Sequence, residues 1–211
     1  MHSRLQGSTN LGIDAATYNG NGVAVFVNTF FEERVEQLFA LAGRVEAAFA
    51  SAGLDYRVVG GLATYLYVEE AEPDAGRLTK DIDILVRRED LDAIAKAVEP
   101  YGLKYRHVAG VDMLVQAGEP SARRAVHMVF TGEKVRQEYP EPAPGLGSPR
   151  SLKGVRLISI ADLVIMKLTS YRAKDEAHLK DLDEAGLITA DIESRLSVPL
   201  RERLVAMRAR G

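Results

Sequence analysis

Two aspartates, Asp81 and Asp83, interrupt an otherwise apolar run that continues as Ile84-Leu85-Val86. The run predicts a buried strand at residues 80–87. Because side chains alternate across a strand, both carboxylates project from the same face. Two such charges repel each other unless a cation lies between them. Mg²⁺ takes oxygen ligands and is usually held by one or two carboxylates together with substrate phosphates, so the pair predicts phosphate chemistry.

A glycine pair upstream strengthens this interpretation. Residues 56–59 form a short β-branched run, Gly60-Gly61 follows, and residues 61–68 have helical apolar spacing. A glycine turn lets the backbone approach a ligand, and the N-terminus of the next helix offers N–H groups to a phosphate. An isolated Asp-x-Asp is most often a solvated pair on an edge strand. The preceding strand, turn and helix favour a ligand site instead.

Composition excludes several classes of function. The 211 residues are 46% hydrophobic, enough for one domain with a small appended helical part. No cysteine is present, which excludes a cysteine nucleophile and thiolate metal sites. The formal net charge of −3 argues against strong DNA binding. No apolar run has the length of a membrane span and the N-terminus lacks a signal-peptide outline, so we expect a cytoplasmic protein with no membrane partner.

The pattern of elements predicts an α+β fold, with a small mixed or antiparallel sheet, helices on one face and a C-terminal helical part. Residues 1–22 are expected to be a flexible arm, residues 23–27 a short strand or packed arm, and residues 30–52 a helix. Thr29 is the expected N-cap of that helix, and Gly53 ends it. The predicted core spans residues 23–138, a proline-rich linker 139–150, and the C-terminal helical part 151–211, packed on the core.

Further elements follow from periodicity. We expect helices at residues 89–99 and 159–171, and two short helices within 187–208 separated near Pro199. Short strands are expected at residues 104–108, 111–116, 124–130 and 155–158.

A polar stripe interrupts the apolar pattern near the C-terminus. On one continuous helix, a single face would carry Lys167, Tyr171, Lys174, His178 and Asp181. If the helix breaks near Arg172, the stripe divides and Asp175 enters a first helical turn. A solvated face with spaced ion pairs is the alternative to a functional role.

Together these motifs resemble the nucleotidyltransferase superfamily of the DNA polymerase beta type, and within it the AbiEii-toxin-like and related bacterial branch. The resemblance covers most of residues 56–190. It is carried by Gly60-Gly61, by Asp81-Ile82-Asp83, and by the segment from Met166 to Asp175 followed by His178-Leu179-Lys180-Asp181.

The resemblance implies a nucleotidyltransferase fold and a set of site residues. Gly60, Gly61, Lys80 and Lys174 are expected to hold the nucleotide, and Asp81 and Asp83 to hold Mg²⁺. The implied catalytic residues are Asp81, Asp83, Lys167, Asp175 and Asp181.

Two positions depart from the family pattern. Gly61 stands where a serine is usual, which leaves backbone N–H groups alone to hold phosphate. His127 stands where a third carboxylate is expected. It is a candidate metal ligand, although Mg²⁺ prefers oxygen, and a half-buried structural histidine is an equal alternative. Asp112, on the preceding strand, is the other candidate third acid.

The leading hypothesis is a Mg²⁺-dependent transfer of NMP from an NTP to a hydroxyl of RNA, a protein or a small molecule. The resemblance also points to a toxin–antitoxin system, in which a cognate antitoxin or toxin would be a partner. The second hypothesis is a catalytically degenerate protein of the same fold that binds a nucleotide or a partner. A phosphohydrolase with an aspartate nucleophile fits the upstream glycine turn poorly.

Overall fold

The structure is a computed structural model that describes residues 21–73, 75–77, 79–118 and 125–210, with side chains from residue 34 onward. It divides into two compact units, residues 1–35 and 36–211. The described part of the first unit is the beginning of α1 (Asn21–Ser51). The expected arm therefore lies mostly outside the described residues, as does Arg124 of the expected strand 124–130.

The start of α1 differs from the prediction. Residues 23–27, expected as a strand or packed arm, are helical, and Thr29 lies inside α1 instead of capping it. Their β-branched residues favour strands only weakly, and such a preference is readily overridden by context. The predicted end is correct, because Gly53 has φ +64° and its N–H bonds to the carbonyl of Ala50.

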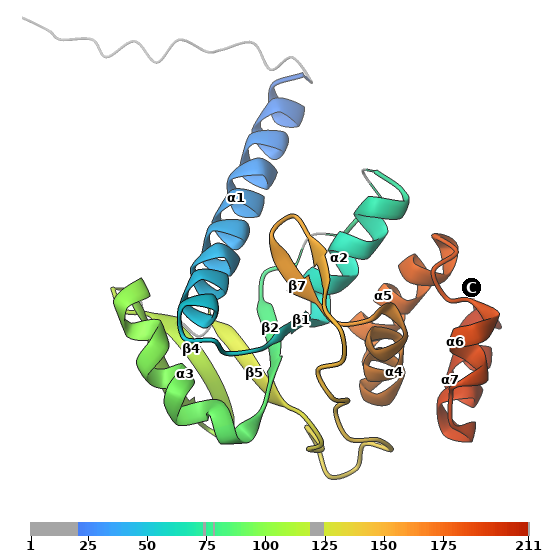
Figure 1. Cartoon of the computed structure of the whole chain (residues 1–211). Coiled ribbons are helices and arrows are strands. Elements are labelled where there is room, and N and C mark those ends of the chain that lie inside the picture. Colours follow the sequence, from blue (N-terminus) through green and yellow to red (C-terminus); the bar gives the residue numbers. More distant parts are fainter. Residues whose placement is uncertain (1–20, 74, 78, 119–124, 211) are drawn as a thin grey trace, which may run out of the picture. The chain divides into compact units, whose positions relative to one another are not determined.

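The second unit is built on a seven-stranded mixed sheet in the order β3-β4-β5-β2-β1-β7-β6 (Figure 1). The strands are β1 (Arg57–Val59), β2 (Ile82–Val86), β3 (Leu103–Val108), β4 (Val111–Gln116), β5 (Val126–Phe130), β6 (Arg150–Leu152) and β7 (Val155–Leu157). The central strand β2 pairs antiparallel with β1 and parallel with β5. The predicted α+β class with a mixed sheet is confirmed.

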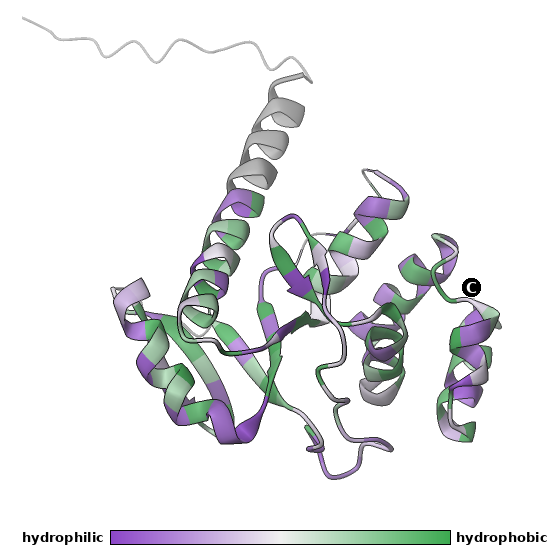
Figure 2. Ribbon diagram, in the orientation of Figure 1, coloured by the Kyte–Doolittle hydropathy of each residue, from purple (hydrophilic) through white to green (hydrophobic). Residues whose placement is uncertain are grey.

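The remaining helices are α2 (Gly60–Ala71), α3 (Leu91–Val98), α4 (Ile160–Ser170), α5 (Ala173–Glu184), α6 (Ala190–Ser194) and α7 (Val198–Arg208), with short 3-10 helices η1 (Arg88–Asp90) and η2 (Glu99–Tyr101). Helices α4 to α7 gather beyond β1 and β7, away from α3 (Figure 1). Figure 2 shows mixed polar and apolar colours along α7, consistent with an amphipathic helix that buries Leu200, Leu204 and Met207. Pro199 lies in the first turn of α7 and not between the helices, a position where its missing N–H costs nothing.

The junction between α4 and α5 determines whether the predicted polar stripe lies on one continuous helix. Tyr171 has φ 45° and ends α4 in the left-handed conformation, so the helix is not continuous. The side chain of Arg203 donates to the carbonyls of Leu168 (2.7 Å) and Thr169 (2.8 Å), which satisfies the end of α4. The single-face stripe is therefore wrong, and the alternative with Asp175 in the first turn of α5 is confirmed.

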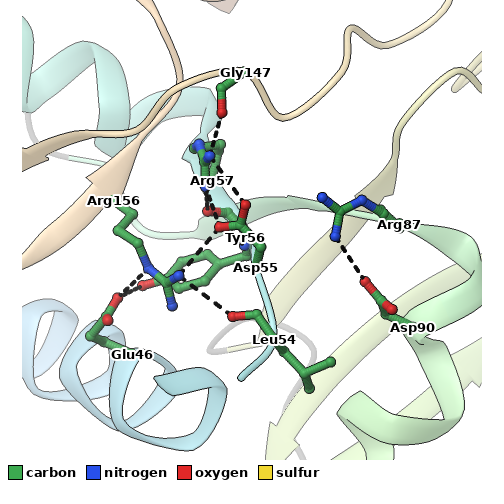
Figure 3. Close-up of polar contacts among 9 residues, drawn as sticks. All are labelled: Glu46, Leu54, Asp55, Tyr56, Arg57, Arg87, Asp90, Gly147 and Arg156. Atoms are coloured by element: carbon green, nitrogen blue, oxygen red, sulfur yellow. Dashed lines mark hydrogen bonds and ion pairs between the residues drawn. The ribbon is translucent and has the colours of Figure 1, made fainter. Parts of the chain in front are cut away.

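An ion-pair cluster connects the later half of α1 to β1 and β7 (Figure 3). Its members are Glu46, Asp55, Tyr56, Arg57 and Arg156. Arg156 Nε donates to Glu46 at 3.0 Å, and its guanidinium lies 4.5 Å from the centre of the Tyr56 ring. Arg57, only 2% exposed, bonds Asp55 and the carbonyl of Gly147.

Residues 131–149, all described, contain no helix or strand, and the chain then re-enters the sheet at β6 and β7. Within the described residues, no helix has the length and apolar character needed to cross a membrane.

Candidate functional site

The glycine turn brings the start of α2 against the carboxylate of Asp83. Gly60 has φ +67°, and a Cβ atom placed on it would lie 2.0 Å from Oδ2 of Asp83. Only glycine permits both the left-handed conformation and this close approach. The N-cap residue of α2, Val59, makes no side-chain capping bond, so it leaves the first N–H groups of the helix available to a ligand.

The sheet register places His127 beside Asp83. The two residues are partners in the parallel pair of β2 and β5, and His127 Nδ1 lies 3.6 Å from Asp83 Oδ1. Both side chains remain about a quarter exposed, at 26% and 29%. The contact with Asp83 raises the pKa of His127, against the opposing effect of burial.

Asp112, the other candidate third acid, lies on the opposite face of the sheet. Its neighbour Met113 pairs with His127 and therefore shares a face with His127 and Asp83. Adjacent residues of a strand point to opposite faces, so Asp112 points away from the aspartate pair. Its carboxylate accepts hydrogen bonds from Tyr105 (2.6 Å) and Arg88 (3.2 Å) and contacts His107 Nδ1 (2.8 Å). The geometry does not support Asp112 as a metal ligand.

A cavity of about 350 Å³ opens where β2 and β5 meet the α4–α5 junction. Of the residues predicted for the site, those that line it are Gly60, Asp81, Asp83, His127, Lys167, Lys174 and Asp175. Arg172, which the sequence did not mark as functional, also lines it. The cavity thus unites segments separated by about a hundred residues of sequence.

Asp175 is a fully buried acid in the cavity wall whose oxygens bond protein donors. Its carboxylate accepts from Arg172 Nε (2.6 Å), Ser170 Oγ (2.8 Å) and Lys167 Nζ (3.2 Å). Burial would raise the pKa of Asp175, but these donors hold it at about 2. A carboxylate with this many protein donors organises the wall of the cavity and is poorly placed to receive a metal.

Lys167 is the only lysine among those described in the cavity wall that is buried, at 4% exposure. Burial lowers the pKa of Lys167, while the charges of Asp175 and Asp83 oppose that effect. Its Nζ also lies 2.8 Å from Nδ1 of His178, so these two residues of the predicted stripe are in contact although they lie on different helices. Burial and the charge of Lys167 lower the pKa of His178 to about 4, so its imidazole is neutral at neutral pH.

Besides Asp112, three predicted site residues do not line this cavity. Gly61 faces Thr79, whose Oγ1 would lie 2.5 Å from an added Cβ. Asp181 accepts a 2.9 Å bond from Arg77 Nε, in the segment before β2. Lys80 is exposed immediately before Asp81.

The donor set fits a hard cation only in part. Asp81 and Asp83 line the cavity, and the carboxylate of Asp83 lies against residue 60 because that residue has no Cβ. Within the described part of the chain, however, no group of three or more histidine, aspartate or glutamate side chains could hold a metal by itself. A cation at this position would therefore need ligands from the substrate, as Mg²⁺ commonly has.

No protein-family model and no curated protein sequence matches the chain. Solved structures do. An antigenic nucleotidyltransferase-like protein from Paracoccidioides brasiliensis matches with a TM-score of 0.54 at 15% identity, over 83% of this chain and 88% of that one. The antibiotic-resistance factor ANT(2'')-Ia matches with a TM-score of 0.52 at 15% identity, over 84% and 94%. The chain has the nucleotidyltransferase fold.

The Megavirus polyadenylate synthase shares this fold over 90% of the present chain but only 41% of its own, with a TM-score of 0.50 and 10% identity. The resemblance drawn from Gly60-Gly61 and Asp81-Ile82-Asp83 is thus confirmed at the level of the superfamily's fold. The AbiEii-toxin-like branch stays a prediction. Within the nucleotidyltransferase fold, the glycine turn, Asp81 with Asp83, and the α4–α5 junction line one cavity.

Proposed function

We propose that the chain is a Mg²⁺-dependent nucleotidyltransferase that moves NMP from an NTP to a hydroxyl acceptor. The observation that carries this proposal is the cavity in which Gly60, Asp83 and Lys167 meet. These residues provide the three features that phosphoryl chemistry needs, namely a close backbone approach, open carboxylates and a buried cation.

In the proposed reaction, the acceptor hydroxyl oxygen attacks the α-phosphorus, the bond from the α-phosphorus to the pyrophosphate oxygen breaks, and the hydroxyl proton passes to water. Asp81 and Asp83 would hold Mg²⁺, with His127 at the edge of this set. Bound there, Mg²⁺ would neutralise phosphate charge and lower the pKa of the attacking hydroxyl. Lys167 and Lys174 would bind phosphate oxygens, and the first N–H groups of α2 would face the triphosphate.

The proposal admits three classes of molecule that carry the acceptor hydroxyl, namely RNA, protein and small molecules. One structural neighbour, ANT(2'')-Ia, forms a complex with adenylyl-2''-tobramycin, and another is named a polyadenylate synthase. The resemblance to toxin-type proteins favours RNA or protein for this chain, with an antitoxin or toxin as its partner.

Label transfer tests the proposal. The full-length protein is incubated with each α-³²P-labelled NTP, MgCl₂ and a cell extract, and labelled products are separated by gel and thin-layer chromatography. The matched variants are Asp81→Asn with Asp83→Asn, and Asp92→Asn as a control that removes an exposed carboxylate from α3. We expect label transfer by the wild type and Asp92→Asn only. Transfer that survives loss of both acids would refute the assigned chemistry.

A catalytically degenerate nucleotide-binding or partner-binding protein is the second candidate. It is favoured by His127 at the position of the third acid and by the absence, among described residues, of a complete ligand group. Thermal shift with ATP and MgCl₂ separates the two, because a ligand that binds only the folded state raises the melting temperature. Stabilisation that is unchanged in Asp81→Asn/Asp83→Asn, without label transfer by the wild type, would favour this candidate.

A further inference from the structure

The ammonium group of Lys167 is anchored by two partners from α5. Nζ lies 3.2 Å from Oδ1 of Asp175 and 2.8 Å from Nδ1 of His178. An ammonium group has three N–H donors, so these partners use two of them. The third has no hydrogen-bond partner among the described residues, and the side chain lines the cavity.

The contact with His178 has a defined direction. An ammonium nitrogen has no lone pair, so Lys167 must donate and Nδ1 of His178 must accept. Acceptance requires a neutral imidazole with its proton on Nε2. The surroundings agree with this assignment, since His178 is partly buried beside the positive charges of Lys167, Lys174 and Arg77.

The other anchor is itself held in place. Asp175 is 0% exposed and is bonded by Ser170 from α4 and by Arg172 from the junction. A side chain with only this anchor could still rotate its remaining N–H bonds about the Nζ–Asp175 direction. A second fixed partner removes that freedom and orients the third N–H.

We infer that His178 is a positioning residue that, with Asp175, orients the ammonium group of Lys167 so that its free N–H meets an anionic group of the nucleotide. This inference rests on the proposed function for the identity of the ligand. The anchoring of Lys167 belongs to the protein alone and can be tested without nucleotide.

Two substitutions separate the hydrogen bond from the packing. His178→Phe keeps a ring but removes the acceptor, whereas His178→Asn can place its amide oxygen close to the position of Nδ1. We expect the affinity of the full-length protein for ATP, measured by calorimetry with MgCl₂, to fall about tenfold in His178→Phe and less than about threefold in His178→Asn. His107→Phe, at a histidine that contacts Asp112 elsewhere on the sheet, should leave the affinity unchanged. Equal losses in both His178 variants would overturn the inference.

A double-mutant cycle tests whether His178 acts through Lys167. In a Lys167→Met background, His178→Phe should cause no further loss of ATP affinity, because the group that it orients is absent. Lys180→Met, at an exposed lysine of α5, is the matched control and should leave the tenfold effect of His178→Phe intact. A tenfold effect that persists in Lys167→Met would indicate general damage to the fold and refute positioning.

The anchoring is tested in the protein without nucleotide by following the titration of Lys167 through its Cε resonance. Loss of an acceptor from a charged donor lowers the pKa of that donor. The midpoint for Lys167 should fall in His178→Phe and match the wild type in His178→Asn. An unchanged midpoint in His178→Phe refutes the anchor, whatever ATP does. Wild-type protein that binds none of the four NTPs refutes the proposed function and the ligand contact, and the titration then decides the anchoring by itself.

Discussion

The cavity and the ion-pair cluster both place charged side chains beside β1, but they differ in how far neighbouring side chains neutralise those charges. In the cluster, the charges of Arg57 and Arg156 are each met by a carboxylate, from Asp55 and Glu46 (Figure 3). In the cavity, His127 is the only charged-type side chain paired with Asp83 among the described residues, and 29% of the Asp83 side chain stays exposed. Charges that neutralise one another hold the fold together, and acids left open mark a site for a ligand.

Asp175 combines features of the cavity and of the ion-pair cluster. It lies in the cavity wall, but its oxygens are bonded to Lys167, Ser170 and Arg172, like the acids of the ion-pair cluster. Its position in the cavity is therefore a poor guide to its role. What distinguishes a structural acid from an open one is the number of protein donors that it already accepts.

The largest effect is expected from removing an open charge. Asp83→Asn keeps the size of the side chain but weakens its hold on a divalent cation, so NMP transfer should fall about a thousandfold, equivalent to about 4 kcal/mol. The free energy of unfolding should change by less than about 0.5 kcal/mol, because the carboxylate forms no ion pair with lysine or arginine among the described residues. Labelled-NTP assays and urea unfolding measure both. A large loss of stability with unchanged NMP transfer would contradict the distinction between the open acid Asp83 and the paired charges of the ion-pair cluster.

Breaking the ion-pair cluster should show the complementary result. Arg57→Met leaves Asp55 without its closest cation. Because Arg57 is 2% exposed but Asp55 is 35% exposed, we expect a cost of about 2.5 kcal/mol of unfolding free energy, below the usual cost of breaking a fully buried pair. Transfer per folded molecule should stay at the wild-type level. The control is Arg195→Met, which removes an exposed pair with Asp191 and should cost less than about 0.5 kcal/mol. Similar costs for both arginines in urea unfolding would contradict the assigned role of burial.

Acid should destabilise the protein through His178. Its pKa is about 4 in the folded protein, below the ordinary value of 6.5, so at pH 5 the unfolded chain binds more protons than the native one. The stabilising contribution is complete above about pH 6.5 and is lost as the pH falls towards 4. After allowance for partial exposure, the loss is on the order of 2 kcal/mol. Urea unfolding at a series of pH values should show this slope in the wild type and a reduced slope in His178→Asn.

The sequence predicted the parts of the site that depend on local pattern. Gly60, Asp81 and Asp83 could be found because a glycine turn and an alternating pattern are properties of neighbouring residues. The side of the sheet on which Asp112 lies depends instead on how β4 pairs with β5, which local alternation does not determine. The pairing of Lys167 with His178 depends on the helix break at Tyr171. The sequence pattern left both a continuous helix and a broken one open.

The ion-pair cluster was missed altogether, although one signal was present. Asp55 and Arg57 are two residues apart, a spacing that places side chains on the same face of a strand. The apolar residues that follow are typical of a core strand and give no indication of an ion pair. Its other two charged members, Glu46 and Arg156, come from segments that only the folded sheet brings together.

The smallest effect is expected from removing one of the hydrogen bonds that Glu46 accepts in the ion-pair cluster. Tyr56 is fully buried and its hydroxyl donates to Glu46 at 2.7 Å, a bond that raises the pKa of Tyr56 in addition to the effect of burial. Tyr56→Phe removes that donor but keeps the ring beneath Arg156, and Glu46 retains its bond from Arg156 Nε. Because the acid is not left alone, we expect a loss of about 1 kcal/mol in urea unfolding, below the usual range for a bond to a charged group. Tyr56→Leu, which also removes the ring, should cost more. Equal costs for the two variants would mean that the hydroxyl, and not the ring beneath Arg156, provides the whole contribution of Tyr56 to the cluster.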